Sequence, residues 1–149
     1  MTRRRIGVGF LAGFLAVAST HAAPADTAAA FETTKRQSLE VHAALIPKAA
    51  PAVRAKISAS ALAGRTYLSG CSRNCDFYSF LSRDLRLRFP RSSGRELELL
   101  ALLVFAETVN SPLAVQIAME MQKNLVETYQ KIQKARSAAD DTLIQNLRP

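Results

Sequence analysis

The stretch Glu96–Val109, ELELLALLVFAETV, decides the fold of this chain. Between Leu97 and Ala106 its only charged residue is Glu98, so a helix built from the run has no fully polar face. A helix that is apolar on nearly all sides must be covered by other elements. The run is also shorter than the about 20 apolar residues that cross a bilayer. It therefore predicts the buried central helix of a small all-α bundle.

Both ends of this central helix carry recognisable signals. Ser93 is suited to cap the first turn, and Glu96, three residues later, is suited to complete a capping box. Asn110, Ser111 and Pro112 mark its end, and proline in the first turn of a helix is favoured. The sequence thus predicts that a further helix begins directly after the central one.

Outward from the centre, apolar spacing and breakers predict a single helical domain over residues 31–149, with four or five helices in all. Residues 23–30 are rich in alanine and are expected to form a flexible leader. Gly64 is expected to end the second helix as a C-terminal glycine, and Asn74 to cap the third. The expected helices outside the central one span 27–46, 52–63, 75–88 and a long segment from 112, with a break at 137–141 before a short final helix or a continuation.

The first 22 residues have the features of a secretory signal peptide. Arg3, Arg4 and Arg5 precede the apolar run Ile6–Ala18, and small residues around Ala22 suit cleavage there or nearby. The alternative is an uncleaved anchor, which Ser19, Thr20 and His21 argue against because they cut the run short of a span. We expect a bacterial Sec-type signal and a periplasmic or secreted protein without a transmembrane helix.

Cys71 and Cys75 are the only two cysteines of the chain. In an oxidising compartment such a pair most often forms a disulfide, and residues four apart in a turn bring their Cα atoms to about 6 Å, within the range that a disulfide tolerates. The alternatives are free thiols and a metal or redox site, in which the pair would handle copper. Methionines also suit Cu(I), but His42 lies on a different expected helix.

Arginines concentrate in the middle of the chain. Residues 65–95 contain seven arginines and two aspartates, a net charge of +5. Removing residues 1–22 lowers the net charge of the chain from +8 to +5. The net positive charge of the exported chain therefore equals that of residues 65–95 alone. Arginine forks recognise carboxylates and phosphates, and export favours an anionic envelope surface over nucleic acid. The alternative is an ordinary solvated face. The candidate anion-binding residues are Arg83, Arg86, Arg88 and Arg91.

The expected last helix has an apolar seam with coiled-coil-like spacing. If the small domain leaves that seam uncovered, it offers a helix-in-groove or dimer surface. The candidate partner-binding residues are Met121, Leu125, Thr128 and Ile132.

Residues suited to catalysis are few. Only His42 remains after cleavage, so no Ser/His/Asp or Cys/His set can be assembled, and Glu98 and Glu107 point in nearly opposite directions on the central helix. No glycine-rich phosphate loop is present. The sequence predicts a non-enzymatic, exported interaction protein without a cofactor, such as an accessory subunit or chaperone of an envelope or secretion assembly, with copper or redox handling as the alternative.

Overall fold

The computed structural model describes residues 24–136 and 141–149, and within these ranges the fold is all-helical, as predicted. The expected signal peptide, residues 1–22, lies outside the described residues. The described residues form seven α-helices, more than the predicted four or five, because the last predicted helix is divided and two of the helices have only five and six residues. The elements are α1 Pro24–Leu45, the 3₁₀ turn η1 Ile46–Lys48, α2 Pro51–Gly70, α3 Phe77–Arg88, α4 Gly94–Val109, α5 Pro112–Gln116, α6 Met119–Ala135 and α7 Asp141–Asn146.

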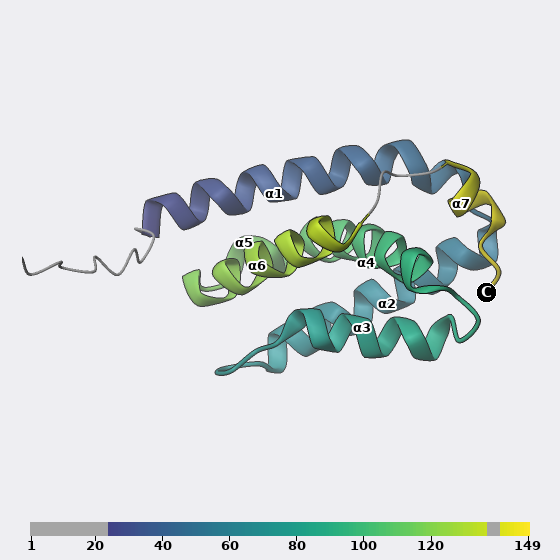
Figure 1. Cartoon of the computed structure of the whole chain (residues 1–149). Helices are drawn as coiled ribbons and strands as arrows, with labels where there is room; N and C mark the ends of the chain where they lie inside the picture. The colour runs from purple at the N-terminus through teal and green to yellow at the C-terminus, as the bar shows by residue number, and fades with distance from the viewer. Residues whose placement is uncertain (1–23, 137–140) are drawn as a thin grey trace, which may run out of the picture.

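The helix α4 is the centre of the bundle, as its apolar run predicted. It contacts α1, α2, α3 and α6, and every residue of it from Leu99 to Ala106 is buried. In Figure 1, α1 lies above α4 and α6, while α2 and α3 lie below them. Consecutive long helices run in opposite directions, so the loop between α2 and α3 comes to the same end of the bundle as α5 and the start of α6.

The predicted start of α4 is confirmed. The Glu96 N–H donates to Ser93 Oγ at 3.3 Å, and the Ser93 N–H donates to Glu96 Oε2 at 2.8 Å, which forms a capping box. The start of α3 differs from the prediction, because its cap is Asp76 and not Asn74. Asp76 Oδ1 accepts from the Ser79 N–H at 3.0 Å, whereas Asn74 adopts a left-handed φ of 53° in the preceding loop.

The prediction that α2 ends at Gly64 was wrong. The helix continues to Gly70, and Gly64 is buried in its interior. A Cβ added at Gly64 would lie 3.2 Å from both Phe77 Cε2 and Thr108 Oγ1, so the glycine allows α2 to approach α3 and α4 closely. The expected loop over 65–74 is accordingly reduced to the residues after Gly70.

Two further expectations were wrong. Residues 24–30, expected to form a flexible leader, are the first turns of α1. The long last helix from residue 112 is divided, because Ile117 and Ala118 have extended ψ angles of 128° and 158°. Ile117 packs against the core, and the break allows α5 to contact α4 before α6 begins.

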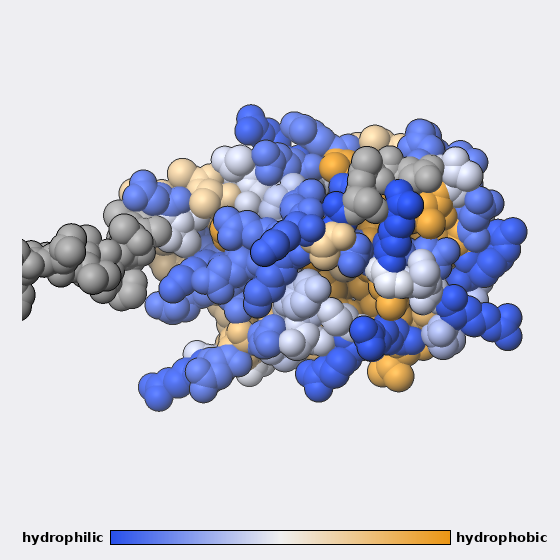
Figure 2. Space-filling model, viewed as in Figure 1, coloured by the Kyte–Doolittle hydropathy of each residue, from blue (hydrophilic) through white to orange (hydrophobic). Residues whose placement is uncertain are grey.

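One face of the described surface is mostly polar. On that face, shown in Figure 2, hydrophilic side chains predominate and hydrophobic ones are visible in a few separate patches. Among the described residues, no helix combines the length and the apolar character that crossing a bilayer requires.

Candidate functional site

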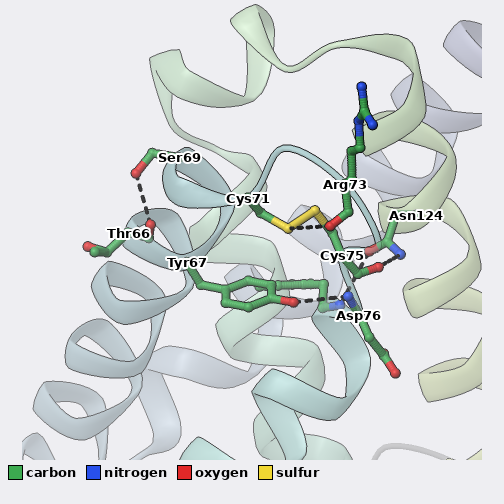
Figure 3. The surroundings of a disulfide bond; sticks show 9 residues. Thr66, Tyr67, Ser69, Cys71, Arg73, Cys75, Asp76 and Asn124 are labelled. Carbon is green, nitrogen blue, oxygen red and sulfur yellow. Dashed lines mark hydrogen bonds between the residues drawn. A yellow bond between two sulfur atoms is a disulfide. The ribbon is translucent and has the colours of Figure 1, made fainter.

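The loop between α2 and α3 is closed by a disulfide. The structure joins Cys71 and Cys75, with their Cα atoms 5.9 Å apart, as the spacing predicted. Figure 3 shows Arg73 at the tip of this loop, with its side chain extending away from Tyr67 and Asp76. The disulfide loop, residues 71–75, thus presents a cation on a short covalently closed turn.

Neighbouring helices hold the C-terminal end of the disulfide loop (Figure 3). Asn124 of α6 donates from Nδ2 to the Cys75 carbonyl at 2.6 Å and accepts from the Phe77 N–H at Oδ1 at 3.4 Å. The Asp76 N–H donates to the Tyr67 hydroxyl at 2.9 Å. Because a single asparagine satisfies two backbone groups, α6 fixes the start of α3 relative to the loop.

A cleft of about 660 Å³ lies between the disulfide loop and the start of α6. Both cysteines and Met121 line it, together with polar residues of α6. Met119, by contrast, is not among its lining residues. The cleft is therefore lined by one methionine together with both cysteines.

A second hollow, of about 920 Å³, runs between α2 and α3 and ends at the disulfide loop. We call it the α2–α3 groove. Its apolar surface includes the stacked rings of Tyr67 and Phe80, whose centroids lie 4.5 Å apart, and Leu62, which is 59% exposed. Arg73 lies at one end and Arg88 at the other. The groove is lined by Ala59, Leu62, Ala63, Thr66, Tyr67, Gly70, Cys71, Ser72, Arg73, Phe80, Asp84 and Arg88.

The four candidate anion-binding arginines do not form one cluster. Arg83, Arg86 and Arg91 are exposed, but Arg88 donates from Nε to Asp84 Oδ2 at 2.7 Å, and that carboxylate also accepts from Ser60 Oγ at 2.6 Å. Positions 86 and 88 are about 200° apart around a helix, so they face different sides of α3. The structure places Arg88, and not Arg86, at the α2–α3 groove.

The candidate partner-binding seam is largely covered by the chain itself. Leu125, Thr128 and Ile132 are exposed by 0%, 2% and 1%, because α6 packs against α1, α3 and α4. Only Met121 of the four is partly exposed. These side chains belong to the core of the described fold, so a partner site on the bundle surface must use other residues.

A polar cluster that the sequence did not predict joins α1, α2 and α4. His42 Nε2 donates to Glu107 Oε1 and Ser58 Oγ donates to Glu107 Oε2, both at 2.9 Å, while Arg65 Nη1 donates to the Glu107 carbonyl at 3.4 Å. Burial alone would raise the pKa of Glu107. The hydrogen bonds from His42 and Ser58, with the charges of His42 and Arg65, outweigh it and hold that pKa below its ordinary value. His42 and Ser58 both donate to the Glu107 carboxylate and not to each other. The cluster therefore holds three helices together without the geometry of a nucleophilic triad.

The described part of the chain contains no cluster of the side chains that most often bind metal ions. Within it, no three or more His, Cys, Asp and Glu side chains are arranged to hold a metal ion.

No protein-family model, curated protein or solved structure matches the chain.

The α2–α3 groove was missed because α2 was expected to stop at Gly64. Positions 59, 62, 63, 66, 67 and 70 follow the i, i+3, i+4, i+7 spacing of one helix face, and the signal becomes visible once α2 continues to Gly70. Leu62 lies on this exposed face. The cluster around Glu107 had no sequence signal, since His42, Ser58 and Glu107 are far apart in the chain.

Proposed function

We propose that this chain is an exported, non-enzymatic helical interaction protein that serves as an accessory subunit or chaperone of an envelope or secretion assembly. The observation that carries the proposal is the α2–α3 groove, in which exposed apolar side chains lie beside arginines on a rigid scaffold. A concave apolar surface with a charged rim is typical of peptide and helix recognition. The basic and apolar segments at the N-terminus support export through a Sec-type signal to the periplasm or beyond.

A disulfide at one end of the groove suits that role. In an oxidising compartment the Cys71–Cys75 bond holds the disulfide loop in one conformation. A loop that is already fixed in one conformation before binding loses less conformational entropy when a partner binds. Arg73 is therefore a fixed part of the proposed surface.

Crosslinking in intact cells followed by affinity capture tests the proposed function. The expected result is a discrete protein adduct from the periplasmic or secreted fraction. Recovery of only the uncrosslinked chain, together with monomeric behaviour at micromolar concentration, would reject a role as an interaction protein.

Copper handling is the second candidate, and one observation favours it. Met121 lines the same cleft as Cys71 and Cys75, so a thiol reductant acting on the disulfide would leave two thiols and a thioether lining one cleft, and the thiols would bind a metal as thiolates with loss of their protons. Such soft sulfur ligands select Cu(I). Titration of the reduced chain with Cu(I) against a competing chelator should show one tight site that Met121→Leu weakens by about tenfold or more, whereas Met119→Leu leaves it unchanged. Equal affinities of both variants would exclude the three-sulfur site.

A further inference from the structure

The charge of the molecule is concentrated on one side. Residues 51–95, which form α2, the disulfide loop, α3 and the turn into α4, carry two acidic and nine basic residues. The rest of the exported chain has no net positive charge, since residues 23–50 are balanced and residues 96–149 have a net charge of −2. The nine cations are Arg54, Lys56, Arg65, Arg73, Arg83, Arg86, Arg88, Arg91 and Arg95.

Both carboxylates on this basic side are already engaged. Asp76 accepts from the Ser79 N–H and hydroxyl as the cap of α3. Asp84 accepts from Ser60 and Arg88. Neither Arg73 nor Arg83 has an ion-pair partner in the part of the chain that the structure describes. At the groove, Arg73 therefore has no ion-pair partner among the described residues, whereas Arg88 is paired with Asp84.

Apolar side chains lie between these cations. Leu62 and Leu87, exposed by 59% and 82%, are two of the three large hydrophobic side chains found exposed among the described residues. Leu62 lines the α2–α3 groove. Leu87 lies seven positions after Phe80 on α3, within about 20° of the same line along the helix, and extends the apolar strip past the groove. Arg83, about 60° from Phe80, flanks that strip on its exposed side.

The dimensions of the groove suit a helix. From Ala59 to Gly70 the α2 side of the groove spans about 16 Å, or three helical turns. The hollow lies between the side chains of two neighbouring helices. A third helix can pack its own side chains into a groove of this kind. A bilayer surface is flat on this scale and would not fill a concave hollow.

We propose that the α2–α3 groove binds an acidic amphipathic helix of a partner protein. The inference rests on the proposed interaction function and adds to it the partner's chemistry. The apolar face of the helix lies on Leu62, Tyr67 and Phe80, and its carboxylates meet Arg73 at one end and Arg83 along the outer edge. Complementary charge sets the orientation of the helix and excludes basic partners.

Two designed peptides of about 15 residues test this with the oxidised exported chain. Both carry leucine at i, i+3, i+4, i+7, i+8 and i+11, and the remaining positions are mainly glutamate in one peptide and mainly lysine in the other. Fluorescence anisotropy should show the acidic peptide binding at least about tenfold more tightly, with an affinity that falls as salt is added. Equal affinities for the two peptides, or no binding of either, would overturn the proposal.

Surface substitutions locate the site. Leu62→Glu and Arg73→Glu should each lower the affinity for the acidic peptide by about tenfold or more. Their matched controls, Met119→Glu and Arg36→Glu, make the same changes at exposed positions of α6 and α1 and should stay within about twofold of the unchanged chain. Circular dichroism checks that all four variants stay folded. An equal loss in Arg36→Glu would attribute binding to net charge and reject the groove.

Two outcomes separate this inference from the function on which it rests. If a cellular partner is captured equally by the unchanged chain and by Leu62→Glu, the groove is rejected and the interaction function stands. If vesicles of phosphatidylglycerol and phosphatidylcholine bind through Leu62 while the acidic peptide does not, the surface recognises lipid and the helix proposal fails.

Discussion

Gly64 shows how one residue sets the distance between helices. The position of its missing Cβ is bounded by Phe77, which is fully buried, and by Thr108, whose hydroxyl donates to the Val104 carbonyl at 2.8 Å. Neither neighbour is the free end of a flexible side chain. A larger residue therefore forces Phe77 and Thr108 to shift, or α2 to move away from them.

Gly64→Val should lower the free energy of unfolding by about 1–3 kcal/mol, the usual range for overpacking a core. The matched control is Gly70→Val, because a Cβ at Gly70 meets no atom within 4 Å. The control should change stability by less than about 1 kcal/mol. Urea denaturation of both variants decides the matter, and equal effects would show that Gly64 is not a packing glycine.

Glu107 predicts a pH dependence. Its pKa in the folded chain lies below the ordinary value of 4.5, so the ionised carboxylate stabilises the fold above that pH. The contribution is lost as the pH falls from about 4.5 through the lowered pKa of the folded state. Glu107→Gln should destabilise the chain by about 1–3 kcal/mol at pH 7, because it weakens the bonds from His42 and Ser58.

The measurement is urea denaturation of both chains from pH 7 to pH 3. The difference in stability between them should shrink below pH 4.5. A difference that stays constant over this range would mean that the charge of Glu107 contributes nothing to stability.

At the scale of elements, the disulfide is expected to act locally. It closes a loop of only a few residues, so the loop-entropy model gives a stabilisation of about 2 kcal/mol or less. Cys71→Ser combined with Cys75→Ser should therefore leave a folded bundle with α-helical circular dichroism, while the start of α3 exchanges its amide hydrogens faster. A chain that no longer folds would show that the loop organises more than α3.

An element can be predicted from the sequence when the interactions that determine it are local in the chain. The capping box and the apolar run of α4 are local signals, so Ser93, Glu96 and the central position of the helix could be predicted. The end of α2 could not, because Gly64 serves a contact with Phe77 and Thr108 that exists only in the folded chain.

Some residues of the candidate site could be predicted from the sequence and others could not. The Cys71–Cys75 pair could be predicted because these are the only two cysteines and their spacing suits a disulfide. Leu125, Thr128 and Ile132 were misassigned to a free surface because their burial depends on α1 and α4 packing over α6. Apolar seam spacing does not distinguish a core face from a docking face.

At the scale of the whole molecule, the proposed export predicts a definite N-terminus. If the signal is removed after Ala22, the chain from the periplasm or medium begins at Ala23. Intact-mass measurement under non-reducing conditions should give that mass less two hydrogens for the disulfide. A chain that retains Arg3, Arg4 and Arg5 would contradict processing.

The basic side of the bundle is proposed to dock a protein, and site-specific photocrosslinking in intact cells tests this docking most directly. A photoreactive residue at Thr66, which is exposed and lines the α2–α3 groove, is compared with one at Ala43 on α1. We expect a discrete adduct from position 66, joined to an acidic amphipathic segment of the partner, and none from position 43. No adduct from position 66, or equal adducts from both positions, would contradict it.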